Sequence, residues 1–88
     1  MKIRQTPGSK YNLGPNIRKY RKQAGLTQEN TVAKLQLLGI EISRGSYSQI
    51  ECGLVSIKVE ELLGLASIFS VSIEDFFEGI SLTNPVLK

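Results

Sequence analysis

Few side chains of this 88-residue sequence could carry out catalysis. The sequence contains no histidine, which is the commonest general base and the commonest metal ligand in proteins. Its single cysteine, Cys52, excludes a disulfide within the chain and a metal site built from cysteines. Ser-His-Asp and Cys-His arrangements are therefore excluded, and we expect neither an enzyme nor a bound metal or cofactor. We interpret Cys52 as a passive small residue rather than a redox switch.

The side chains with the clearest chemical use are the cations, which concentrate in one half of the sequence. Nine of the 11 basic residues and two of the 8 acids lie in residues 1–50, which therefore carry a net charge of +7. Residues 51–88 hold two basic and six acidic residues, a net charge of −4, and the whole chain carries +3. This asymmetry favours a basic face for a polyanion, with the acidic half turned away. A solvated surface without a partner is the alternative interpretation.

The remaining composition is typical of an ordinary folded domain. The hydrophobic fraction is 41% and the charged fraction is 22%. No apolar run approaches the roughly 20 residues that cross a bilayer, and the first residues lack the apolar core of a secretory signal. We therefore expect a cytoplasmic protein with an N-terminal arm over residues 1–13, one folded domain over 14–79 and a C-terminal tail over 80–88.

The two ends of the chain each leave two interpretations open. Residues 1–13 have no periodicity and indicate an extended arm or a disordered tail. Their cations could reach a nucleic-acid groove or could only solubilise that tail; they are Lys2, Arg4 and Lys10. The last segment is apolar for a terminus, and it could cover the core or form a dimer contact. Its apolar residues are Phe77, Ile80, Leu82, Val86 and Leu87.

Capping residues and apolar spacing predict three helices in the first two thirds of the domain. The first begins at Gly14-Pro15 and stops at Gly25. The second has Thr27 as its N-cap and ends at Gly39, and its apolar face is Val32, Leu35 and Leu38. The third has Ser43 as its N-cap, runs to about Glu51 and is terminated by Gly53, with Tyr47 and Ile50 facing inward.

Two more helices are predicted after a short connection. The fourth covers Val59–Phe69 and buries Leu62, Leu65, Ala66 and Phe69. The fifth is short and begins at Ser72. We interpret the aromatic residues Tyr47, Phe69 and Phe76 as core rather than as a stacking platform for single strands. Five short helices predict a compact all-α domain, in which the second and third have helix-turn-helix proportions.

Three motifs in this order resemble the phage repressor/Cro-like (XRE) family of helix-turn-helix proteins. They are Gly25-Leu26-Thr27-Gln28-Glu29, the segment from Ser43-Arg44 to Ile50-Glu51 with Gly53, and Val71-Ser72 before the last helix. The similarity covers residues 16–78. It implies a five-helix lambda-repressor-like fold whose third helix enters the major groove of DNA.

The resemblance also assigns roles to individual residues. Arg44 would bond a guanine and Gln49 an adenine, each through two hydrogen bonds. Gln28 would bond a phosphate at the start of the second helix. Arg21 and Glu51 would form a partly buried ion pair that fixes the third helix. The other residues expected to face DNA are Ser43 and Ser46, and Arg18 and Lys19 are expected to reach phosphates or to remain solvated.

The sequence departs from the family pattern in three places. Residues 36–42 are a few residues longer than in the shortest phage repressors, which we interpret as an extra turn on the second helix. Thr31 replaces the usual leucine, so we expect looser packing there. Lys58 stands where a Ser, Thr or Asp cap is common, so we expect the start of the fourth helix to shift toward Ser56.

These observations predict a transcriptional regulator, most simply a repressor, that binds double-stranded DNA at a palindromic operator as a homodimer. The alternative is the antitoxin of a toxin–antitoxin pair, which would bind a toxin and regulate its own expression through the same fold. A protein-interaction module that has lost DNA binding is a third hypothesis. The polar side chains of Arg44 and Gln49 argue against it.

Overall fold

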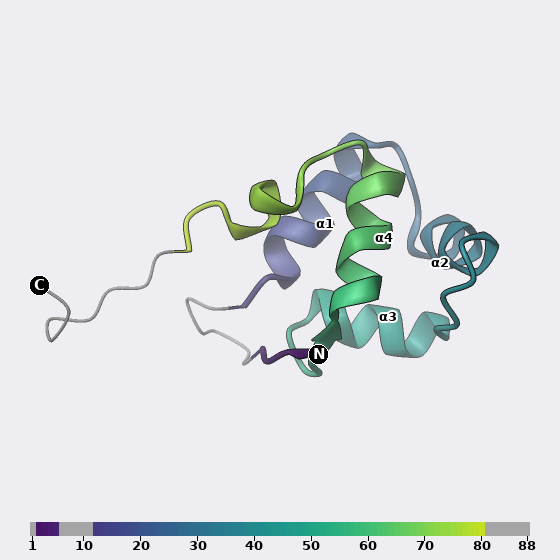
Figure 1. Ribbon diagram of the computed structural model, residues 1–88, viewed down its shortest axis with the longest axis horizontal. Coiled ribbons are helices and arrows are strands. Elements are labelled where there is room, and N and C mark those ends of the chain that lie inside the picture. The colour runs from purple at the N-terminus through teal and green to yellow at the C-terminus, as the bar shows by residue number, and fades with distance from the viewer. Residues whose placement is uncertain (1, 6–11, 81–88) are drawn as a thin grey trace, which may run out of the picture.

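The computed structural model describes residues 2–5 and 12–80, and it confirms the predicted all-α fold class. Its α-helices are α1 (Gly14–Gln23), α2 (Gln28–Leu37), α3 (Arg44–Glu51) and α4 (Val59–Phe69) (Figure 1). The predicted fifth helix is a short 3-10 helix, η1 (Ile73–Phe77), so the described residues form four α-helices rather than five.

Local hydrogen bonds explain where the helices begin. The Thr27 hydroxyl accepts the backbone N–H of Asn30 at 3.0 Å, and Ser43 Oγ accepts that of Ser46 at 3.1 Å, so both predicted N-caps are confirmed. The expected shift of the fourth helix toward Ser56 is wrong. Lys58 is the N-cap of α4, because Glu61 Oε1 accepts its backbone N–H at 2.8 Å and so replaces a capping side chain.

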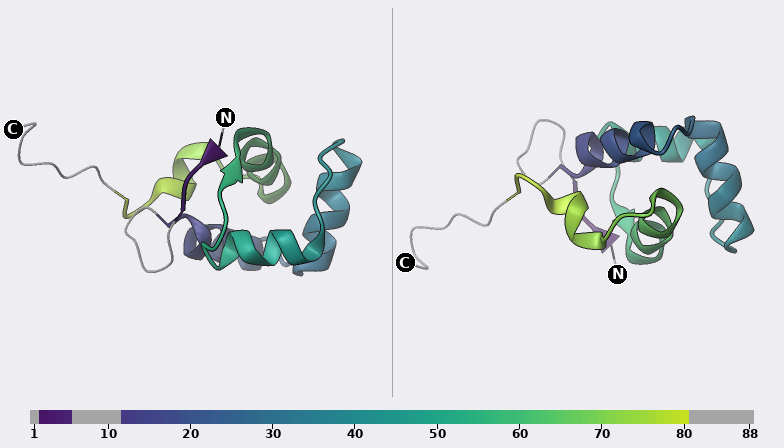
Figure 2. Two further views of the ribbon diagram at one scale, coloured as in Figure 1. Left: turned by 90° about the horizontal axis from the view of Figure 1, so that it is seen from below. Right: turned by 90° about the horizontal axis from the view of Figure 1, so that it is seen from above.

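The helices α2 and α3 cross steeply. In Figure 1, α2 is seen almost along its axis while α3 lies in the plane of the picture. The connection between them contains Gly39 with a φ of 82°, a left-handed conformation that glycine adopts without strain. The helix α4 packs against α2, the helix α1 packs against both α3 and α4, and η1 lies against α1 (Figure 2). The outer surface of α3 is therefore left uncovered by the other described elements.

The core joins side chains from every helix. The predicted inward residues Tyr47, Phe69 and Phe76 are buried, and Phe76 makes edge-to-face contacts with Phe69 and Tyr20 at centroid distances of 6.3 and 6.0 Å. Thr31 is fully buried and its hydroxyl donates to the Thr27 carbonyl at 2.8 Å, so its polar group has a partner. Leu38 is 53% exposed, so its predicted place on the buried face is wrong, because α2 ends at Leu37 and Leu38 is only the C-cap.

The first described residues of the N-terminal arm, 2–5, begin with a short strand and are held against the domain. Lys2–Ile3 (β1) pairs antiparallel with Ile57–Lys58 (β2), with Lys2 opposite Lys58 (Figure 2). Gln5 is buried, and its side chain donates to the Ile50 and Val55 carbonyls and accepts the Leu13 N–H. These contacts hold residues 2–5 against the end of α3, so the disordered-tail alternative is wrong for them. Lys10 lies outside the described residues.

Candidate nucleic-acid interface

The two faces of α3 differ in burial and in chemistry. Tyr47, Ile50 and Glu51 are buried, whereas Arg44 and Gln49 are exposed. Successive helical residues are rotated by about 100°, so Gly45 and Gln49 fall on the side of α3 opposite the buried residues. Arg44 lies about 140° from Gln49 around the helix and is exposed as the first residue of α3. The exposed surface of α3 therefore has a cation at its start and an amide and a glycine on its outer side. Such a surface can enter a groove and donate or accept hydrogen bonds there.

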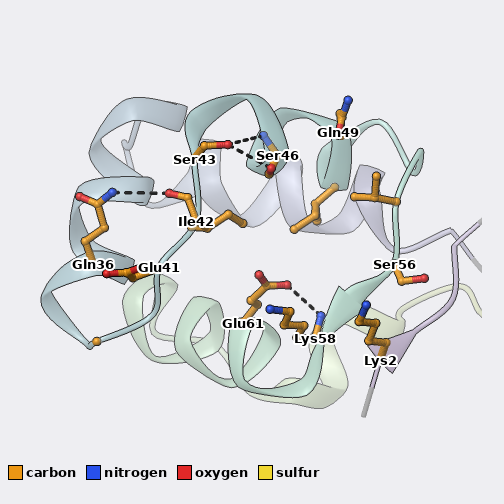
Figure 3. A pocket seen from close by; sticks show the side chains of 13 residues that line it. Lys2, Gln36, Glu41, Ile42, Ser43, Ser46, Gln49, Ser56, Lys58 and Glu61 are labelled. Atoms are coloured by element: carbon orange, nitrogen blue, oxygen red, sulfur yellow. Dashed lines mark hydrogen bonds between the residues drawn. The ribbon is translucent and has the colours of Figure 1, made fainter.

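The two serines predicted to face DNA, Ser43 and Ser46, are bonded to each other at the start of α3. Ser43 Oγ accepts the Ser46 backbone N–H and donates to Ser46 Oγ at 3.0 Å, so its hydroxyl is engaged in the cap of α3. Both serines lie on the flank of α3 that borders a surface hollow between α3 and the start of α4 (Figure 3). We call this the α3–α4 hollow, and its wall includes Ser43, Ser46, Gln49, Ser56, Lys2 and Lys58. In Figure 3 the Gln49 amide projects away from the hollow.

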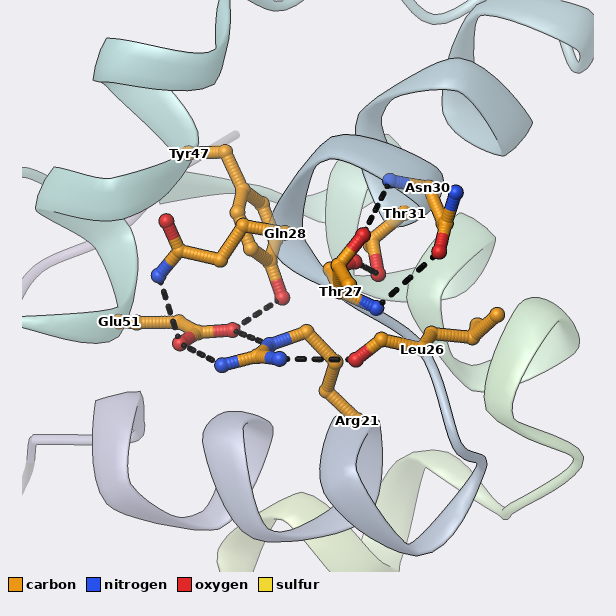
Figure 4. A network of polar contacts seen from close by, with 8 residues as sticks. All are labelled: Arg21, Leu26, Thr27, Gln28, Asn30, Thr31, Tyr47 and Glu51. Atoms are coloured by element: carbon orange, nitrogen blue, oxygen red, sulfur yellow. Dashed lines mark hydrogen bonds and ion pairs between the residues drawn. The ribbon is translucent and has the colours of Figure 1, made fainter.

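Glu51 connects three helices through one buried carboxylate (Figure 4). Arg21 Nε lies 2.6 Å from Glu51 Oε2 and Arg21 Nη2 lies 3.1 Å from Oε1, which is a two-point ion pair. Arg21 Nη1 donates to the Leu26 carbonyl at 2.8 Å, between α1 and α2. The ion pair therefore fixes the C-terminal end of α3 against α1.

Tyr47 also bonds this carboxylate, a contact that the sequence analysis missed. Its phenol donates to Glu51 Oε2 at 2.5 Å. Burial raises the pKa of the Tyr47 phenol far above its usual range, and the adjacent Glu51 raises it further. Tyr47 therefore stays protonated as a donor. Tyr47 and Glu51 are four residues apart on one helix, a spacing that brings side chains together, so the sequence contained a signal for this contact.

Gln28 makes an intramolecular contact as well. Its amide nitrogen donates to Glu51 Oε1 at 3.0 Å, so part of its predicted phosphate-binding capacity is used within the protein (Figure 4). The amide has a second N–H, and the first backbone N–H groups of a helix have no intrahelical acceptor. The start of α2 therefore keeps donors for an anion, held in position by Glu51.

The predicted cations on α1 lie on different sides of that helix. Arg18 is exposed and lies about 60° from Arg21 around α1, on the side toward α3. Lys19 lies about 160° from Arg21 and forms an ion pair with Glu78, which also accepts the Tyr20 hydroxyl at 3.1 Å. Lys19 is thus engaged with the segment after η1, whereas Arg18 has no ion-pair partner among residues 2–5 and 12–80.

The described residues include few other candidate sites. Cys52 is exposed and unpaired at the C-cap of α3. Within residues 2–5 and 12–80, no group of three or more Asp, Glu, Cys or His side chains gathers as a metal site. None of the helices in this part of the chain has the length and apolar character needed to cross a bilayer.

Comparison with known proteins gives one family and one fold. The model of the helix-turn-helix family matches residues 17–76. Among solved structures, the fold is similar to the restriction-modification controller protein C.AhdI from Aeromonas hydrophila, with a TM-score of 0.62 and 24% identity. This similarity covers 75% of the present chain and 92% of C.AhdI. No curated protein sequence matches the chain.

Proposed function

The chain belongs to the helix-turn-helix family, in its XRE branch of DNA-binding transcription regulators, and on this premise we propose that it is a sequence-specific repressor. In this proposal α3 enters the major groove of duplex DNA. Arg44 bonds a guanine and Gln49 bonds an adenine, each through two hydrogen bonds. Occupying the operator then blocks transcription by steric exclusion.

The division of α3 into two faces is the observation that carries this proposal. Its inner face is fixed by Tyr47, Ile50 and the Glu51 ion pair, so the helix is presented rigidly. Its exposed surface holds Gln49 on the outer side and Arg44 at the first residue of the helix. A fixed helix with exposed polar side chains at its start and on its outer side suits readout of base edges, because those contacts need defined geometry.

Contacts with phosphates would orient α3 in the groove. The start of α2 supplies backbone N–H groups and the second N–H of Gln28, and Arg18 supplies a cation on the same side as α3. The pairing of Lys19 with Glu78 makes Lys19 the weaker candidate. The lopsided charge, +7 over residues 1–50, supports the same orientation.

As a homodimer, the protein would bind the two half-sites of a palindromic operator with two copies of α3. Two copies would place their α3 helices in successive major grooves, about 34 Å apart. The predicted dimer contact starts at Phe77 and Ile80, which are partly buried against the core. Leu82, Val86 and Leu87 lie outside the described residues.

An antitoxin that represses its own synthesis is the second candidate. The observation that favours it is the exposure of large apolar side chains away from α3, with Leu37 at 86% and Leu63 at 54%. A protein partner would cover such residues. Co-purification of a small toxic protein with the full chain would support this candidate, and purification of the chain alone from cells expressing its neighbouring genes would argue against it.

Selection of bound sequences from random duplex DNA tests the main proposal. Performed at about 50 and 200 mM salt, it should enrich a palindrome with half-sites about one helical turn apart. Affinity should fall steeply between the two salt concentrations, because bound phosphates release counterions. A bound pool without a common sequence would exclude sequence-specific readout, and a flat salt response would exclude the DNA interface itself.

A further inference from the structure

Two lysines face each other across the small sheet. In the antiparallel register, Lys2 on β1 is the direct partner of Lys58 on β2, and both side chains are exposed. Like charges placed directly opposite each other are unfavourable. Neither ammonium group has an ion-pair partner among the described residues. Within the described residues, the sheet therefore places two lysines side by side, and neither is engaged in an ion pair.

The position of this lysine pair is fixed by the fold. Ile3 packs against the core opposite Ile57, which is fully buried. Gln5 donates to the carbonyls of Ile50 and Val55 at 3.2 and 3.0 Å. Because Ile50 belongs to α3, these bonds tie β1 to the end of that helix, and Lys2 keeps a fixed place relative to α3.

Both lysines line the α3–α4 hollow together with Ser46 and Gln49 (Figure 3). In that view the α3 residues lie along one side of the hollow and the strand residues lie along the other. A duplex whose groove receives the outer face of α3 also presents a phosphate backbone beside the helix. The hollow is lined at this flank by Lys2, Lys58 and the hydroxyl of Ser56.

Two acids, Glu41 and Glu61, border the same hollow, and among the described residues neither forms an ion pair with Lys2 or Lys58. Lys58 also borders a second, smaller hollow with these acids and Glu60, so Lys2 is the more isolated charge. Glu61 is buried and its Oε1 accepts the Lys58 backbone N–H. Glu41 lies at the opposite end, beside Gln36 and away from Lys2 (Figure 3). The end of the hollow that holds Lys2 and Ser56 is accordingly the positive one.

We propose that Lys2 and Lys58 form a second phosphate-binding site beside α3, through which the N-terminal strand takes part in binding duplex DNA. The inference rests on the proposed function. A phosphate between the two ammonium groups turns their mutual repulsion into a shared attraction. Because phosphates carry no sequence information, the site contributes affinity and orientation rather than base preference.

Single and double variants of the full chain test this site, with fluorescence anisotropy of labelled duplex DNA as the readout. Lys2→Gln and Lys58→Gln should each reduce the slope of log affinity against log salt by about 0.9. The ratio of parent to variant affinity should therefore shrink about 3.5-fold between 50 and 200 mM salt. The loss should be equal on the selected operator and on a random duplex. The matched control is Lys34→Gln, an exposed lysine of α2 that does not line the hollow.

The outcomes separate this site from the function on which it rests. If Lys2→Gln and Lys58→Gln behave like Lys34→Gln while the parent binds its operator, the phosphate site is wrong and the DNA-binding proposal stands. If the parent binds no duplex, both the phosphate site and the DNA-binding proposal are wrong. Thermal unfolding monitors the fold, and removing one of two facing like charges should leave the melting temperature equal or slightly higher. A slope reduced only in the lysine pair, with an intact fold, supports the site.

Discussion

Arg21 Nε lies 2.6 Å from Glu51 Oε2 in a buried ion pair that joins α1 to α3. The same carboxylate also accepts the Tyr47 phenol and the Gln28 amide, so one side chain connects α1, α2 and α3. The pair therefore positions both α3, the proposed reading helix, and the start of α2. Loss of the carboxylate should affect the stability of the whole arrangement.

Glu51→Ala should lower the free energy of unfolding by about 3–5 kcal/mol, because it leaves the buried Arg21 guanidinium without its counter-charge. Urea unfolding of the full chain measures this. The control is Glu60→Ala, an exposed acid of α4, which should change stability by no more than about 0.5–1 kcal/mol. Replacing both partners, Arg21→Met with Glu51→Leu, should recover part of the loss. If Glu51→Ala and Glu60→Ala lowered the free energy of unfolding equally, the ion pair would not be what holds α3.

Acidification should destabilise the protein through the same carboxylate. Burial on its own would raise the pKa of Glu51, but the hydrogen bonds from Arg21, Tyr47 and Gln28 outweigh it and hold that pKa below the ordinary value. The charged form then contributes stability above the unfolded pKa of about 4.3, and this contribution is lost as the pH falls through the lower folded pKa.

Urea midpoints measured from pH 7 down to pH 3 should therefore fall less steeply for Glu51→Gln than for the parent. Glu78→Gln serves as the comparison. The pKa of Glu78 is also lowered, by its hydrogen bonds with Lys19 and Tyr20, but this carboxylate is exposed. Its variant should keep most of the parent's acid dependence. If the urea midpoint of Glu51→Gln fell with pH as steeply as that of the parent, Glu51 would not be the source of the acid destabilisation.

Replacing Gly45 and Gly14 by alanine should change the stability of the fold in opposite directions. A Cβ at Gly45 would meet nothing nearer than Ser43 Oγ at 4.0 Å, so Gly45→Ala should stabilise α3 by about 0.4–1 kcal/mol. A Cβ at Gly14 would lie 2.1 Å from the Glu51 backbone oxygen, so Gly14→Ala should destabilise by about 1–3 kcal/mol. Because Gly45 lies on the outer face of α3, its variant should also bind the operator more weakly despite its higher stability. Unchanged binding by Gly45→Ala would place the DNA elsewhere.

The helices could be predicted from sequence because their signals are local. Thr27 and Ser43 cap helices through bonds to residues three positions later, and the bounds of α4 follow from its apolar spacing. The departures from prediction come from contacts between distant residues. The pairing of Lys2 with Lys58 and the bonds of Gln5 to Ile50 and Val55 join segments about 50 residues apart, and two-residue strands have no measurable alternation.

The same distinction applies to the candidate site. The exposure of Gln49 follows from its helical register against Tyr47 and Ile50, which one helix determines, and Arg44 is exposed as the first residue of α3. The engagement of Lys19 by Glu78 and of Gln28 by Glu51 depends on how η1, α1, α2 and α3 pack together. A family resemblance places such side chains on the right element but does not say which protein groups already occupy them.

The most direct test of DNA readout by α3 is to repeat the duplex selection with Arg44→Ala beside the parent. Arg44 is exposed, so its truncation should leave the fold intact. We predict that the variant selects the parent's operator with one guanine position in each half-site made degenerate, at a cost of about 1–3 kcal/mol for that base pair. An unchanged preference at every position, in a variant that folds and binds, would contradict the account.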